Sequence, residues 1–308
     1  MMNPSLISWT LDTINSPLNT LKSPYDLLGR ISELQTLPVL PGVAMRIIQL
    51  AADLTADAEK LAAVIELDPL LTAQILRWAS SSLYGYPGKI VSVREAISRV
   101  LGFDLVFNLA LGLSTIGLLK APKDGPIGTR FFWVHAMTSS LLMPLLNSHI
   151  PLENRFQDTE LCLAALLHNI GYPLLGDQFP REFTCLNHLM AANPTLSEVA
   201  LESFTLGVSH DTLGAWLMTS WSMPKPIIDV VYHHHNPGYR GDNYRLNLLT
   251  YVNDCLLGGL GIGNGKPQIY TEEILAELHL PVTAINQSLE KLGDKFITIT
   301  DQVDGIIG

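Results

Sequence analysis

The residues of this 308-residue chain that could do chemistry are mainly its nine histidines. Several of them lie on or beside predicted helices that are far apart in the sequence, and one aspartate follows them on a later helix. Imidazole and carboxylate groups that converge from several helices are what a divalent transition metal requires. The candidate ligands on these helices are, in chain order, His135, His168, His210, the run His233–His235 and Asp254.

Each histidine also has an ordinary structural explanation. A lone histidine on an apolar helix usually fills the core and makes one hydrogen bond. The run His233–His235 ends a predicted helix, where basic side chains complement the helix dipole. Neighbouring helical residues point about 100° apart, so at most one or two of these three can face one site. The sequence leaves open which of them does.

Other catalytic patterns are incomplete. The segment from Gly112 to Ile116 is no nucleophile elbow, because isoleucine holds the place of the last glycine. The glycine-rich segment 258–267 has the wrong register for a phosphate-binding loop and is typical of a surface linker. The three cysteines form no C-x-x-C pair, which argues against a zinc ribbon or a disulfide framework.

The elements that must position these residues are helices. Asp68-Pro69 is a helix start, and Ser92 with Glu95 forms a capping box. Thr195 with Glu198 forms a second capping box, whose helix ends at Gly207. Convincing period-2 strands are absent, so the pattern predicts an all-α protein with 13 or more helices.

Composition narrows the function classes. Hydrophobic residues make up 47% and charged residues 16% of the chain, and the formal net charge is −10. The scattered Lys and Arg disfavour direct nucleic-acid binding and an anionic membrane surface. No signal peptide is evident, and the most apolar stretch, 105–119, is shorter than the roughly 20 residues that span a bilayer. We therefore expect a cytoplasmic protein without a membrane span.

The order of the candidate ligands resembles the metal site of the HD superfamily of phosphohydrolases. The segment Leu166–Gly171, Leu-Leu-His-Asn-Ile-Gly, is similar to that family's Leu-Leu-His-Asp-Ile-Gly, with Asn169 in place of the aspartate. Further motifs resemble the HDOD domain, the HD-related output domain. They are Leu37–Ala44, Glu66–Arg77, Ser80–Gly85, Ser92–Gly102, Asn108–Ala110 and Gly214–Leu217.

The resemblance implies an N-terminal helical lobe packed on an HD-like multi-helix bundle, and a role in bacterial signal transduction. It implies a metal site, with iron, zinc, nickel or manganese as the candidate ion. The ligands that it implies are His135, His168, Asn169, His210, His234 or His235, and Asp254. We expect an N-terminal extension (1–30), the N-terminal lobe (31–120), the bundle (121–258), and a linker with a short helical tail (259–308). Members of the family are generally regarded as regulatory modules that have lost hydrolytic chemistry.

Two departures favour a non-catalytic protein. Asn169 lacks the charge of the HD aspartate, and Tyr172 stands where the cyclic-dinucleotide phosphodiesterases of the superfamily carry lysine. The first hypothesis is a signalling module that contacts a partner protein. Trp78, Tyr84 and Tyr86 are the candidate anchors, because such aromatics are typical of interfaces. The alternatives are a metal-dependent phosphohydrolase acting on a nucleotide or cyclic dinucleotide, and a nucleotide-sensing domain.

Overall fold

The computed structural model describes residues 37–51, 53, 55–81, 84–116, 119–262 and 270–307. Every regular element in those ranges is a helix, as the sequence predicts. The expected N-terminal extension, Leu83 and part of the glycine-rich linker lie outside the described residues. None of the described helices is both long enough and apolar enough to cross a lipid bilayer.

The N-terminal lobe begins with short helices that are capped by their own sequence. Asp68 accepts hydrogen bonds from the main-chain N–H groups of Leu70 and Leu71. Ser92 accepts from the N–H of Glu95, whose carboxylate accepts from the N–H of Val91. The predicted helix starts at these two places are therefore confirmed. The helices are α3 (Gly42–Ala51), α4 (Ala58–Ile65), α5 (Pro69–Ala79), α6 (Val93–Ala96), the π-helix η2 (Ile97–Leu101) and α7 (Phe103–Ile116).

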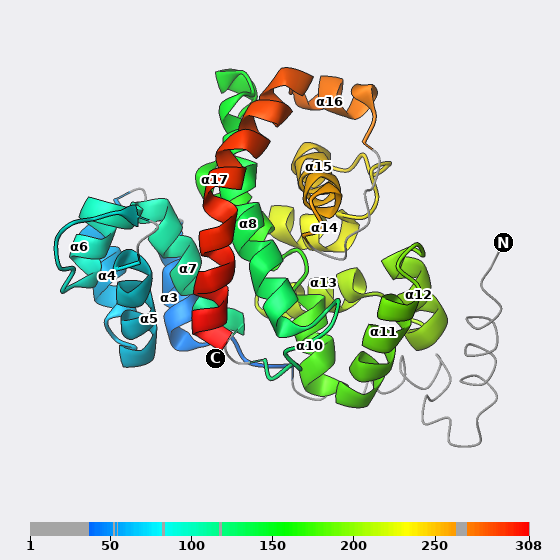
Figure 1. Cartoon of the computed structure of the whole chain (residues 1–308), viewed down its shortest axis with the longest axis horizontal. Helices are drawn as coiled ribbons and strands as arrows, with labels where there is room; N and C mark the ends of the chain where they lie inside the picture. Colours follow the sequence, from blue (N-terminus) through cyan, green and yellow to red (C-terminus); the bar gives the residue numbers. More distant parts are fainter. Residues whose placement is uncertain are drawn as a thin grey trace.

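The bundle is built around α8 (Thr129–Ser148), the helix that carries His135. Figure 1 shows α17 running along α8, with the N-terminal lobe to one side and the other bundle helices to the opposite side. The remaining helices are η3 (Leu152–Asn154), α9 (Asp158–Leu167), α10 (Gly171–Gln178), α11 (Pro180–Ala192), α12 (Glu198–Leu206), α13 (His210–Ser220), α14 (Lys225–His233), α15 (Tyr244–Gly259), α16 (Glu272–Leu278) and α17 (Val282–Ile307).

Two local expectations need correction. The cap residue of α12 is Ser197, so Thr195 and Glu198 do not form a capping box, although Gly207 does end the helix in a left-handed conformation. The C-terminal tail is longer than expected, because α17 spans 26 residues. Its buried side chains at Ile285, Leu292 and Ile299 recur every seven residues and so form one apolar face.

The aromatic anchors proposed for a partner do not lie at an exposed turn tip. Trp78 is only 4% exposed and belongs to the core of the N-terminal lobe, so it is removed as an interface anchor. Tyr84 and Tyr86 are half-buried and pack against that core. Burial raises the pKa of Tyr84, and Tyr86 accepts a long hydrogen bond from Arg99.

Candidate metal centre

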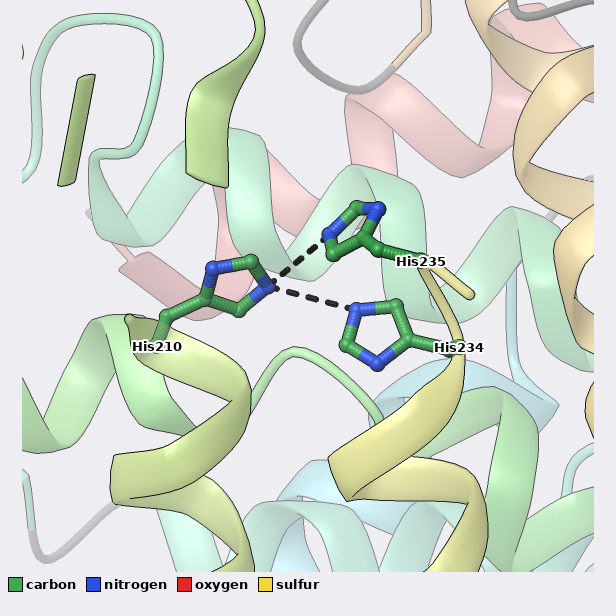
Figure 2. A group of neighbouring side chains, drawn as sticks. All are labelled: His210, His234 and His235. Atoms are coloured by element: carbon green, nitrogen blue, oxygen red, sulfur yellow. Dashed lines mark hydrogen bonds between the residues drawn. The ribbon is translucent and has the colours of Figure 1, made fainter. Parts of the chain in front are cut away.

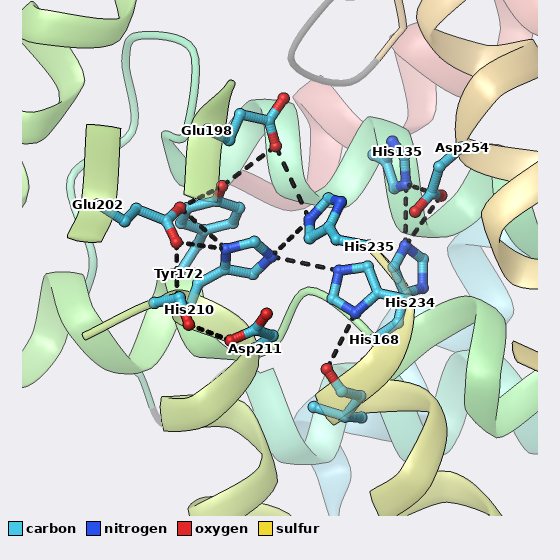
Figure 3. A network of polar contacts seen from close by, with 12 residues as sticks. His135, His168, Tyr172, Glu198, Glu202, His210, Asp211, His234, His235 and Asp254 are labelled. Carbon is cyan, nitrogen blue, oxygen red and sulfur yellow. Dashed lines mark hydrogen bonds and ion pairs between the residues drawn. The ribbon is translucent and has the colours of Figure 1, made fainter. Parts of the chain in front are cut away.

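Five helices or their ends carry the candidate ligands to one place in the bundle (Figure 3). His135 lies within α8, His168 directly follows α9, and His210 is the first residue of α13. His234 and His235 follow the last residue of α14, and Asp254 lies within α15. The clustering predicted from sequence is therefore present, and the ligand atoms form two adjoining groups.

The first group joins His135, His168 and Asp254. The Nε2 atoms of the two histidines are 3.0 Å apart. One carboxylate oxygen of Asp254 lies 3.2 Å from the Nε2 of His135 and 3.3 Å from that of His168. Three ligand atoms therefore converge on one point between α8, α9 and α15.

The second group joins His210, His234 and His235, whose rings face one another in Figure 2. The Nε2 of His210 lies 3.2 Å from the Nε2 of His234 and 3.2 Å from that of His235. His233 takes no part, because its ring stacks on Tyr239 with 3.8 Å between ring centroids. Two of the three consecutive histidines face the site, which answers the question that the sequence left open.

The groups adjoin through His168 and His234, whose ring centroids are 5.2 Å apart. Asn169 directly follows His168 and is partly buried. Among the described residues, its recorded polar contact is through its main-chain carbonyl, which accepts from the N–H of Tyr172 at 3.1 Å. The role of Asn169 as a metal ligand therefore stays a prediction.

Hydrogen bonds on the far side of the rings set which nitrogens face the centre. The Nδ1 of His168 donates to the carbonyl of Ala164 at 2.8 Å, and the Nδ1 of His234 donates to that of Val231 at 2.9 Å. The Nδ1 of His210 donates to Glu202 at 2.9 Å. Nδ1 protonation leaves the Nε2 lone pairs pointing inward, which is the tautomer that metal-ligating histidines normally adopt.

These tautomers call for a cation in the second group. Neutral rings of His210 and His234 would point two lone pairs at each other across 3.2 Å. A proton or a metal ion must lie there to make the contact favourable. Tetrahedral ions with bonds of 2.0–2.1 Å hold neighbouring ligand atoms about 3.3 Å apart. The donor types and their separations in both groups therefore fit a divalent transition metal.

Glu202, which the sequence analysis did not single out, is the carboxylate that fixes His210. It is fully buried on α12 and accepts from the main-chain N–H of His210 at 2.8 Å and from its ring. It also accepts from the Tyr172 hydroxyl at 2.7 Å, and the Tyr172 ring stacks on His210 with centroids 4.0 Å apart. Tyr172 therefore supports His210 and Glu202 from inside the bundle, at the position where the cyclic-dinucleotide phosphodiesterases carry a lysine.

Burial and neighbouring charges shift the pKa values of the groups in this centre in different directions. Burial and the neighbouring His235 hold the pKa of His234 well below its usual value, and burial and His210 lower that of His235. Burial opposes charge at His210 too, but the carboxylate of Glu202 outweighs it and raises the pKa. Although burial disfavours its charge, His168 and His135 hold the pKa of Asp254 well below the usual range. The carboxylates of Asp254 and Glu202, whose pKa values are both lowered, therefore stay ionised.

Two glycines allow the ligand helices to approach closely. A Cβ at Gly171 would overlap the main-chain carbonyl oxygen of His210. A Cβ at Gly214 would lie 2.7 Å from a methyl carbon of Val231. The contacts of α10 with α13 and of α13 with α14 therefore depend on residues without side chains, and these contacts place His210 beside His234.

The ligand side chains are almost closed off from solvent. Exposure is 7% for His135, 1% for His168 and His210, and 0% for His234. The side chains of Asp254 and His235 are 8% and 14% exposed. Structural metal sites in proteins are closed, whereas catalytic sites keep one position open to substrate or water.

The fold is an all-helical bundle that brings histidines and an aspartate together from five helices or their ends. The family model of the HDOD domain matches residues 37–237, and the chain belongs to this family. The match covers the described N-terminal lobe and the bundle up to the histidine run.

Several solved structures resemble the chain. A putative signal transduction protein from Marinobacter aquaeolei VT8 is 31% identical, with a TM-score of 0.84 over 96% of this chain and 69% of that one. An HDOD domain protein of unknown function from Geobacter sulfurreducens is 22% identical, with a TM-score of 0.71 over 92% and 97%. A putative metal-dependent phosphohydrolase from Shewanella amazonensis SB2B is 21% identical, with a TM-score of 0.56 over 91% and 98%.

A curated relative, an uncharacterized protein from Treponema pallidum (strain Nichols), is 23% identical over 226 residues. The match covers 73% of this chain and spans 42% of the relative's length.

Proposed function

We propose that this chain is a non-hydrolytic signalling domain of bacteria, in which the histidine-rich centre holds a metal ion as a structural element and the output is contact with a partner protein. The observation that carries the proposal is the closure of the centre, whose ligand side chains are between 0% and 14% exposed. A hydrolase must admit both a phosphate group and a water molecule to its metal.

The donor set supports the metal. His135, His168 and Asp254 would hold one ion, and His210, His234 and His235 offer a second position. A bound ion would supply charge that neutralises the inward lone pairs and carboxylates. The protein's own residues orient the rings from behind and exclude water, which would stabilise the packing of five helices.

Two substitutions support the absence of hydrolysis. Asn169 cannot bridge two cations as a carboxylate does. Tyr172 is stacked on His210 and hydrogen-bonded to Glu202, so its hydroxyl is engaged in the interior. The name of the Marinobacter structure supports a signalling role, and half-buried Tyr84 and Tyr86 remain the candidate partner contacts.

One observation favours the alternative of a metal-dependent phosphohydrolase. The two ligand groups adjoin, and paired ions about 3.5–4 Å apart are typical of phosphate-cleaving enzymes. A nucleotide-sensing role stays a prediction from the resemblance alone.

A turnover assay decides between the two. The full chain is incubated with Mn²⁺, Fe²⁺, Ni²⁺ or Zn²⁺ and with a phosphomonoester, a phosphodiester, nucleoside triphosphates and cyclic dinucleotides. We expect no turnover at or above about 1 s⁻¹, the low end of ordinary enzyme rates. Turnover that His168→Ala abolishes and His188→Ala, an exposed control, retains would establish the hydrolase instead.

A further inference from the structure

Helix α12 presents two carboxylates, one helical turn apart, to the second ligand group. Glu198 and Glu202 are related as i and i+4, so they lie on one face of the helix. The hydroxyl of Tyr172 lies between them, 2.7 Å from Glu202 and 3.4 Å from Glu198. Figure 3 shows both carboxylates directed toward the histidines.

Glu202 has no capacity left for an ion. One of its oxygens accepts from the ring of His210 and from Tyr172, and the other accepts from the main-chain N–H and the ring of His210. This arrangement places a carboxylate behind a histidine ligand, where it holds the tautomer and strengthens the ring as a donor.

Glu198 is in the opposite situation. Its side chain is 11% exposed, and one oxygen lies 4.0 Å from the Nε2 of His235. Among the described residues its recorded side-chain contacts are this one and the 3.4 Å contact with Tyr172, and both are long. Neighbouring ligands of a tetrahedral ion are about 3.3 Å apart, so a movement of about 0.7 Å would bring Glu198 to ligand distance.

The balance of charge also favours a divalent ion in the second ligand group, beside Glu198. The group of His135, His168 and Asp254 offers one carboxylate to a divalent ion. The group of His210, His234 and His235 has two carboxylates beside it, Glu198 at 4.0 Å from His235 and Glu202 behind His210, and their two charges balance those of a divalent ion. A buried charge is tolerated when it is fully compensated.

We propose that Glu198 is the anionic ligand of one divalent transition-metal ion held with His210, His234 and His235, and that Glu202 is a positioning residue for His210. This inference rests on the proposed function, in which the centre holds a metal. It explains how the chain tolerates Asn169, because α12 supplies from elsewhere the charge that position 169 lacks. Three imidazoles and one carboxylate also complete a closed tetrahedral set.

The test is titration of the metal-free full chain with Co²⁺, followed by its visible absorption, and competition with Zn²⁺. Glu198→Gln should weaken the tightest site by at least 10-fold and change the Co²⁺ spectrum. Glu202→Gln should weaken it about 10–100-fold while leaving the spectrum in place, as outer partners of ligands do, and Glu202→Asp should restore part of the affinity. Glu272→Gln is the matched control, because Glu272 also begins a helix but is exposed.

A measurement on the unmodified chain covers the case in which Glu198→Gln does not fold. X-ray absorption of protein loaded with one equivalent of Zn²⁺ should give three imidazole ligands. Two imidazoles would place the ion with His135, His168 and Asp254.

The outcomes separate the inference from the proposed function. If Asp254→Asn removes the tightest site and Glu198→Gln leaves it unchanged, the assignment of Glu198 as a ligand is wrong. The proposed function, in which the domain holds a metal ion, is then retained. If the unmodified chain binds neither Co²⁺ nor Zn²⁺, both the inference and the metal part of the proposed function are wrong.

Discussion

The orientation of three histidines in this centre is set by the hydrogen-bond acceptor on the far side of each ring. His210 is oriented by Glu202, His168 by the carbonyl of Ala164, and His234 by that of Val231. Each of these partners accepts the Nδ1 proton and so leaves Nε2 facing its neighbours. A histidine cluster of this kind is defined as much by its acceptors as by its ligands.

The buried histidines predict an acid-side loss of stability in metal-free protein. His234 and His235 have pKa values below 6.5 when folded, whereas the unfolded chain binds protons near 6.5. Below that pH the unfolded state binds more protons, so the free energy of unfolding falls as pH falls. His210 has a raised pKa, and its contribution is instead lost as pH rises above 6.5 through its folded pKa.

We expect stability to decline by on the order of 1 kcal/mol per pH unit between pH 6.5 and 5. Urea unfolding at several pH values in the presence of a chelator measures it. A His234→Asn variant should have a shallower slope than the wild type, and exposed His188→Asn should not. Equal slopes in all three proteins would show that His234 does not titrate as described.

Residue types predict the candidate ligands of this site but not the groups that support them. The six candidate histidine and aspartate ligands are recognisable because their types are rare and their order resembles that of a known family. Glu198 and Glu202 carry no such signal, since glutamates in a helix are usually solvated, and the sequence favoured a capping role for Glu198. Only the approach of α12 to α13 brings Glu202 against the buried His210. That contact is tertiary and leaves no periodic trace in the sequence.

Among the elements, the packing of α10 on α13 controls the position of His210. Gly171→Ala would force a methyl group into the carbonyl of His210. Overpacking of this kind costs about 1–3 kcal/mol. Gly293→Ala, in an exposed turn of α17 with open space around its Cβ, is the matched control. It should stabilise the protein by about 0.5–1 kcal/mol, because alanine favours helix.

Thermal melts and Co²⁺ binding measure both effects. Gly171→Ala should lower the melting temperature and weaken metal binding together, because the ring of His210 moves with its main chain. A variant that melts lower but binds Co²⁺ as tightly as wild type would show that α10 supports the fold without positioning the ligand.

Some helix starts follow from local chemistry, which is why the sequence predicts them. Asp68 and Ser92 cap their helices through bonds to residues two or three positions away. The burial of Trp78 could not be predicted in this way, because it depends on how the helices of the lobe pack together. Tyr84 also packs against the core, although the neighbouring Gly85 is exposed.

At the scale of the whole molecule, α7 joins the N-terminal lobe to the bundle. Five of its residues, 106, 107, 109, 110 and 111, are no more than 1% exposed. Helix α7 contacts α3, α4 and α5 on the lobe side and α9 on the bundle side. The indole N–H of Trp221 in the bundle also donates to the carbonyl of Pro38 at 2.6 Å. Both parts therefore share one hydrophobic core.

A shared core predicts that the two parts unfold together. Ile75 in α5 and Ile227 in α14 are both fully buried, and replacing either with valine costs about 0.5–1.5 kcal/mol. Hydrogen exchange of the slowest amides in α5 and α13 should report the same loss of protection in both variants, because one global opening exposes both. If Ile227→Val lowers protection in α13 and leaves α5 unchanged, the lobe is an independent folding unit. In that case a change in the stability of the histidine centre would not change the stability of the lobe that carries Tyr84 and Tyr86, the candidate partner contacts.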